Sequence, residues 1–140
     1  MATLDDIISD FEFIDDWEDR YRYVIDLGKK LPELSDDEMN AENKVQGCVS
    51  QVWLISEPDM SDASNPIMHF RGASDAHIVS GLVAIMLIAF SGVPAKAVAN
   101  VNENDIFEKL GLIEHLTPQR ANGLRAMAAR IKQHAADVIS

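Results

Sequence analysis

The chain has 140 residues, of which 47% are apolar, 12 are basic and 23 are acidic, giving a net charge of -11. This length predicts one compact domain, residues 1–140, and the apolar fraction is sufficient for a hydrophobic core. The acidic balance argues against nucleic acid and anionic membrane surfaces as partners, because both require a basic patch.

Two amphipathic helices are predicted at the start of the chain. Thr3 is the expected N-cap of the first helix, whose apolar positions are Ile7, Ile8, Phe11 and Ile14. The second helix is expected from about Asp16 to Leu31–Pro32, with an apolar stripe of Trp17, Tyr21, Val24, Ile25 and Gly28. The polar stretch from Ser35 to Lys44 then predicts a surface loop.

A β-hairpin is predicted in the middle of the chain. Residues Gln51–Ser56 and Ile67–Gly72 both alternate between apolar and polar side chains, as strands do. The segment from Glu57 to Pro66, between these two runs, is rich in turn-forming residues and is expected to be the turn.

Helices are expected again in the C-terminal half. Ser74–Asp75 should open a buried helix whose apolar run, Ile78–Phe90, is shorter than the roughly 20 residues that cross a bilayer. Short helices are predicted at Pro94–Val101 and Glu103–Leu110, and Thr117 followed by proline marks the start of the final helix. The order indicates an α+β fold with a small antiparallel sheet packed against helices.

The expected location is a reducing cytoplasm. The opening residues carry neither the basic nor the apolar region of a signal peptide. A chain with one cysteine, Cys48, cannot form an internal disulfide, which is typical of reducing compartments.

Cys48 is the strongest candidate for chemistry. It follows Gly47, whose backbone can adopt angles closed to other residues, at a point where the strand pattern breaks. A free cysteine is often a small buried hydrophobe, and that alternative remains open. A free thiol is only a few per cent thiolate at neutral pH, so a reactive Cys48 would need a nearby cation or a partner. A single thiol excludes a redox cycle closed within one chain but leaves transfer between molecules open.

The four histidines, His69, His77, His115 and His134, lie in separate segments without metal-ligand spacing. Packing or surface roles are the simplest interpretation for each of them. His69 is a partial exception, because its predicted strand should neighbour the Cys48 segment, where an imidazole could act as a base.

Two charged residues have alternative interpretations. Asp75 is expected to cap the buried helix, with contact to a partner as the alternative. Arg120 falls in the first turn of the last helix, where a positive charge opposes the helix dipole. It is expected either to form a salt bridge with a carboxylate or to contact a thiolate, a persulfide or a partner.

Four sequence blocks, in this order along the chain, resemble those of the SufE family of sulfur acceptor proteins. They are Leu27–Leu34 (LGKKLPEL), Val45–Trp53 (VQGCVSQVW), Gly72–Ala76 (GASDA) and His115–Arg120 (HLTPQR). The resemblance covers nearly the whole chain, and the blocks are far more specific together than singly. It implies a fold like that of IscU/NifU-type scaffolds, in which a small three-stranded antiparallel sheet packs against helices.

The resemblance also implies a function and partners. A SufS-type cysteine desulfurase, which holds the PLP cofactor, would pass persulfide sulfur to Cys48 and be stimulated by doing so. The sulfur would then go to a downstream iron–sulfur scaffold complex, and this chain would need no cofactor or metal of its own. The residues expected to support the loop or the partner interface are Gln46, Gly47, Ser50, His69, Asp75 and Arg120.

Two other functions remain open. A binding adaptor would stimulate the desulfurase by contact alone, without carrying sulfur. A stand-alone cysteine enzyme would require a base, which the sequence does not place. The chain lacks the further ligand cysteines of IscU-type scaffolds, which agrees with a carrier rather than a site of cluster assembly.

Overall fold

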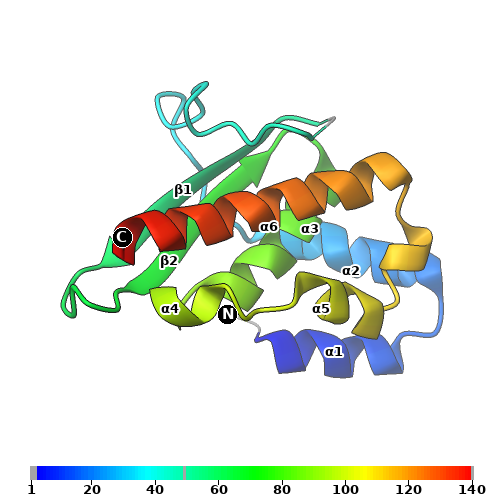
Figure 1. Cartoon of the computed structure of the whole chain (residues 1–140). Helices are drawn as coiled ribbons and strands as arrows, with labels where there is room; N and C mark the ends of the chain where they lie inside the picture. Colours follow the sequence, from blue (N-terminus) through cyan, green and yellow to red (C-terminus); the bar gives the residue numbers. More distant parts are fainter. Residues whose placement is uncertain (1–2, 49, 140) are drawn as a thin grey trace.

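The computed structural model describes residues 3–48 and 50–139 and shows an α+β fold in which helices cover a small sheet (Figure 1). The helices are α1 (Leu4–Phe13), α2 (Trp17–Lys29), α3 (His77–Phe90), α4 (Ala95–Val98), α5 (Glu103–Lys109), the 3-10 turn η1 (Ile113–His115) and α6 (Pro118–Ile139). The strands are β1 (Val52–Asp59), β2 (Ile67–Ser74) and β3 (Val93–Pro94). The predicted fold class, with three antiparallel strands in the order β1-β2-β3, is confirmed.

The sheet is a long hairpin with one short strand added. β1 and β2 pair from Val52 opposite Ser74 to Asp59 opposite Ile67, and β3 joins the far side of β2. Residues 43–45 run along the start of β1, where the Val45 N–H donates to the Val52 carbonyl at 2.8 Å. Residues 46–48 and 50–51 therefore lie in a loop, called the cysteine loop below, whose two ends are fastened to each other.

Helix α3 forms the centre of the molecule. It is buried on nearly all sides, from Gly81 to Leu87 and at Phe90, because α2, the sheet and α6 all pack against it. α2 and α3 approach each other closely where Gly28 meets Gly81. A Cβ added at Gly81 would lie 2.1 Å from the Val24 carbonyl oxygen, so only glycine permits this contact.

The predicted starts of α1, α2 and α6 are confirmed. The Thr3 hydroxyl accepts a hydrogen bond from the Asp6 N–H, and the Asp6 carboxylate accepts one from Thr3 in return. Asp16 caps α2, and the Thr117 hydroxyl accepts from the Arg120 N–H at 3.2 Å. Hydroxyl and carboxylate caps satisfy backbone N–H groups that have no partner inside the helix.

Three element boundaries were predicted wrongly. Residues Glu57–Asp59 belong to β1 instead of the turn. β1 is an edge strand there, so the missing N–H of Pro58 costs no hydrogen bond to a neighbouring strand. The expected helix Pro94–Val101 is helical only over Ala95–Val98, since Pro94 pairs with Ile67 in the sheet.

The third correction concerns the start of α3 and the expected helix cap. Asp75 does not cap this helix, whose N-cap is Ala76 with no side-chain hydrogen bond. Asp75 is bound instead to Gln51, across the end of the hairpin. Of the helices in the described parts of the chain, none combines the length and apolar character needed to cross a membrane.

Candidate functional site

Gly47 and Cys48, in the cysteine loop, lie against α6. Gly47 has a φ of 92°, a left-handed conformation that favours glycine. A Cβ added at this position would lie 3.1 Å from the Ala126 Cβ on α6. Gly47 thus both turns the chain and allows the loop to lie close to the helix.

Cys48 lies half-buried in this loop, in contact with the core. Its thiol donates to the Gly123 carbonyl on α6, with 3.5 Å between sulfur and oxygen. A Cβ added at Gly123 would be only 3.3 Å from the Cys48 Sγ, so the missing side chain makes room for the thiol. Burial raises the pKa of the Cys48 thiol above its ordinary value, and the resting cysteine is therefore protonated at neutral pH.

A cavity of about 360 Å³ opens beside the thiol. Its walls come from three elements: β1, α3 and α6. Apolar side chains form most of the interior, while hydroxyl, amide and guanidinium groups lie among the lining residues at the start of α6. The lining consists of Cys48, Ser50, Val52, Val79, Leu82, Val83, Thr117, Gln119, Arg120, Gly123, Leu124 and Met127.

Arg120 brings a positive charge to this cavity. It is exposed, and its backbone N–H is bound to the Thr117 hydroxyl. Within the described residues its guanidinium forms no ion pair, so the salt bridge considered from the sequence is not observed. A free guanidinium at a cavity that holds a thiol is suited to an anionic sulfur group.

The loop is fastened at its outgoing end by Asp75. The Asp75 carboxylate accepts from the Gln51 N–H at 3.1 Å and from the Gln51 side-chain amide at 3.5 Å. The Asp75 N–H donates to the Gln51 carbonyl in return, at 3.3 Å. Asp75 is therefore bonded to Gln51 at the point where the cysteine loop leads into β1.

The other predicted residues are distributed as follows. Ser50 lines the cavity and Gln46 is exposed, whereas Val49 lies outside the described residues. His69 is exposed on β2 opposite Glu57, five positions along β1 from Val52, and does not line the cavity. It is not placed to act as a base toward Cys48. Over residues 3–48 and 50–139, no group of three or more His, Cys, Asp or Glu side chains could hold a metal ion.

Sequence reasoning missed Gly123 and Gln51. A glycine inside a long helix is unfavourable by about 1 kcal/mol relative to alanine. The glycine at position 123 therefore indicates that another part of the chain packs closely against the helix there. Nothing in the sequence indicates that the approaching group is a thiol 75 residues away. Gln51 carried no separate signal, because its role depends on where the hairpin brings Asp75.

Replacing Gly123 with alanine should unseat the thiol. The added methyl group would crowd Sγ, and the loop tip would shift outward because the loop is the more yielding side of the contact. We expect the rate of Cys48 alkylation by iodoacetamide at fixed pH to rise about fivefold. This corresponds to a loss of about 1 kcal/mol from the free energy that holds the thiol against Gly123. An unchanged or lower rate would show that Gly123 does not set the position of the thiol.

The sequence matches the SufE family, described as an Fe-S metabolism associated domain, over residues 5–135. The chain belongs to the SufE family. This match spans the helices, the hairpin and the cavity, and it gives the protein a place in iron–sulfur metabolism. The resemblance noted in the four sequence blocks is thereby confirmed.

Named SufE-like relatives support the assignment. An uncharacterized SufE-like protein of Rhizobium etli is 58% identical over 135 residues, covering 96% of this chain and 90% of the relative. A second, from Rhizobium meliloti, is also 58% identical and covers 96% of both chains. The solution structure of a hypothetical protein from Thermus thermophilus has the same fold, with a TM-score of 0.72 at 19% identity over 99% of this chain and 98% of that one.

Proposed function

We propose that this SufE family member accepts persulfide sulfur on Cys48 from a SufS-type cysteine desulfurase and delivers it for iron–sulfur cluster assembly. The observation that carries the proposal is the position of the only cysteine, at a loop tip beside a mostly apolar cavity. The pyridoxal phosphate of the reaction would belong to the desulfurase. The proposed setting is the reducing cytoplasm, where a lone thiol remains reduced.

The proposed step is thiol–persulfide exchange. The Cys48 thiol loses its proton, and its thiolate attacks the outer sulfur of the persulfide on the desulfurase cysteine. A new sulfur–sulfur bond forms at Cys48 as the old one breaks, and the desulfurase cysteine leaves as a thiolate that can take up the released proton. No external oxidant is consumed, because the outer sulfur moves between two equivalent thiol groups.

The resting geometry protects the thiol but does not activate it. The half-buried, protonated Cys48 reacts slowly with oxidants, since the thiolate is the reactive form. In the resting structure Sγ faces Gly123 on α6, so we expect docking to move the loop outward and present Sγ to the partner's persulfide. The partner and the free guanidinium of Arg120 would together supply the positive surroundings that favour the thiolate.

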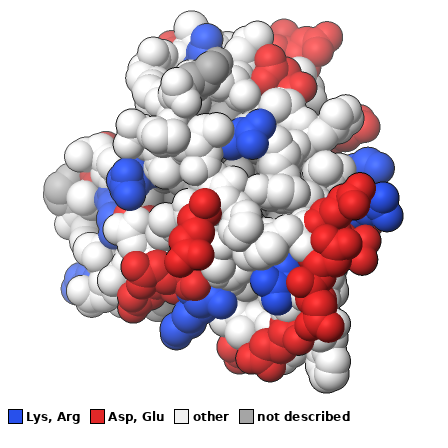
Figure 2. Space-filling view, turned by 90° about the vertical axis from the view of Figure 1, so that its right-hand side faces the viewer, with Lys and Arg blue, Asp and Glu red and all other residues white. Residues whose placement is uncertain are grey.

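The surface charge favours a protein partner over nucleic acid. Eight acidic residues between Asp5 and Asp19 are all exposed, and this stretch contains no basic residue. On the face shown in Figure 2, acidic side chains gather along its lower part while basic ones are scattered. Such a surface repels phosphate backbones and complements a basic patch on a protein.

The acceptor role is tested by intact-mass spectrometry. After incubation with a SufS-type desulfurase, pyridoxal phosphate and L-cysteine, the protein should gain about 32 Da, the mass of one sulfur atom added through thiol exchange. The Cys48→Ser variant should gain nothing, and a reductant should remove the added mass from the wild type. Stimulation of the desulfurase without any adduct would favour the adaptor alternative.

A further inference from the structure

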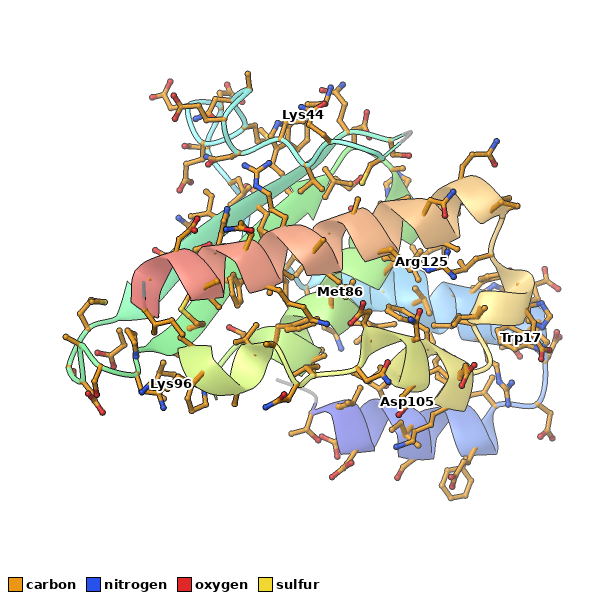
Figure 3. All side chains as sticks on the ribbon, viewed as in Figure 1. Trp17, Lys44, Met86, Lys96, Asp105 and Arg125 are labelled. Carbon is orange, nitrogen blue, oxygen red and sulfur yellow. The ribbon has the colours of Figure 1, made fainter. Side chains whose placement is uncertain are left out.

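The incoming end of the cysteine loop is fastened by a cluster that plays no part in the cavity. Arg130, on α6, donates through one terminal nitrogen to the Lys44 carbonyl at 2.8 Å and through the other to the Glu42 carbonyl. Figure 3 shows Lys44 on the segment that passes above α6. This segment leads directly to Cys48 and pairs with β1 through Lys44 and Val45.

His134 completes the cluster one helical turn further along α6. The Arg130 Nε donates to the His134 Nε2 at 3.2 Å. Because a guanidinium can only donate, Nε2 must be an unprotonated acceptor, and the proton of the neutral ring lies on Nδ1, which contacts the Ser56 hydroxyl of β1. The neutral imidazole thus holds the guanidinium through Nε, while the two terminal nitrogens bind the carbonyls.

We propose that Arg130 is a positioning residue for Cys48, holding the incoming arm of the loop on α6 so that the thiol stays seated against Gly123. A planar fork with five donors suits this task, because it binds two carbonyls and a ring nitrogen at once. Lysine has a single ammonium group and cannot reproduce that geometry. The outgoing arm is held separately by Asp75, so the loop is clamped at both ends.

The state of His134 should control this clamp. Burial lowers the pKa of His134, the charge of Arg130 lowers it further, and Asp137 raises it. These two charged groups lie on α6, while β1 presents the uncharged Ser56 hydroxyl and residues 42–44 present backbone carbonyls to Arg130. Above its pKa the neutral ring accepts from Arg130. Below it, in the range under pH 6.5, the protonated ring would repel the guanidinium and loosen the arm.

The test is the rate of Cys48 alkylation in the full chain. At fixed pH, Arg130→Gln should react about tenfold faster than the wild type, since hydrogen bonds from a charged group are among the strongest in proteins. Arg130→Lys should also react faster, but by a smaller factor. Arg125→Gln is the matched control, because Arg125 lies on the same helix (Figure 3) and, among the described residues, its guanidinium bonds to Asn122 of that helix alone. A wild-type rate in Arg130→Gln would overturn the proposal.

The pH profile separates positioning from a general loss of stability. After correction for the thiolate fraction, the alkylation rate of the wild type should increase as the pH falls below 6.5. His134→Gln should remove that increase, because the glutamine side chain can accept a hydrogen bond from Arg130 but does not titrate. This variant also carries the test if Arg130→Gln does not fold. A flat corrected profile in the wild type would overturn the role of His134.

This inference rests on the proposed function only in treating the Cys48 thiol as the sulfur acceptor. Alkylation requires no desulfurase, so it reports the seating of Cys48 even where sulfur transfer fails. A loss of sulfur transfer in the wild type, with alkylation behaving as described, would contradict the proposed function and leave the clamp intact. Unaltered alkylation in the Arg130 variants, with normal sulfur transfer, would contradict the clamp alone.

Discussion

The Cys48→Ser variant should bind the desulfurase normally yet leave its turnover at the unassisted rate. Serine keeps the size and the half-buried position of the side chain, but its hydroxyl cannot take the outer sulfur of a persulfide. The desulfurase would then remain loaded with sulfur after each cycle, because no acceptor frees its cysteine. The measurement is alanine production from L-cysteine, with wild type and variant compared over a range of concentrations.

Binding must be measured beside turnover for this comparison to decide. Calorimetric titration of the desulfurase with each form should give similar affinities, since only a sulfur atom is exchanged for oxygen at the loop tip. Full stimulation by Cys48→Ser would contradict the acceptor role and establish the adaptor. A variant that neither binds nor stimulates would require Cys48→Ala as a second comparison, which must bind for the acceptor role to stand.

Replacing Gly81 with alanine should destabilise the whole fold. The new Cβ would meet the Val24 carbonyl oxygen at 2.1 Å and the Val24 Cγ1 at 2.5 Å. A backbone oxygen cannot rotate away as a flexible side chain can, so α2 and α3 would have to separate along the centre of the core. We expect the free energy of unfolding to fall by about 3 kcal/mol or more, a large part of the total for a domain of this size. Urea denaturation followed by circular dichroism measures the change.

Gly123→Ala is the matched control for this stability prediction. It is also a glycine-to-alanine change inside a helix, but its Cβ would meet the side chain of Cys48 at the edge of the core. The gain in helix propensity, up to about 1 kcal/mol, should offset much of the crowding, so its unfolding midpoint should stay close to that of the wild type. Equal stability of the Gly81→Ala variant and the wild type would contradict the close packing of α2 on α3.

Much of the fold could be predicted because local signals agreed with the final packing. Thr3 and Thr117 cap helices where the sequence predicts, and the alternating run that begins at Gln51 lies in the predicted hairpin, with β1 starting at Val52. The errors arose where tertiary contacts override local preference. β1 continues through Pro58 because the strand lies at the edge of the sheet. Asp75 bonds to Gln51, although its position in the sequence favoured a helix cap.

The candidate site was only partly predictable for a related reason. Cys48 and Arg120 stand out in the sequence, and the structure brings both to one cavity. Gly123 and Arg130 could not be assigned, because their roles depend on how α6 lies along a loop some 75 to 88 residues earlier in the chain. His69 was singled out from the sequence, but the structure places it away from the cavity. Its strand pairs with β1 along the whole length of the hairpin, and His69 lies opposite Glu57, far from the end that leads to Cys48.

The most direct test of the acceptor role is a single-turnover experiment with L-cysteine carrying a heavy sulfur isotope. The desulfurase and this protein are mixed with one equivalent of labelled cysteine, quenched at successive times and digested for mass spectrometry. If Cys48 is the acceptor, the label should appear first on the desulfurase cysteine and then on the peptide containing Cys48, at a rate that matches the stimulated turnover. Stimulated turnover with the label never reaching Cys48, or reaching it more slowly than turnover, would contradict that role.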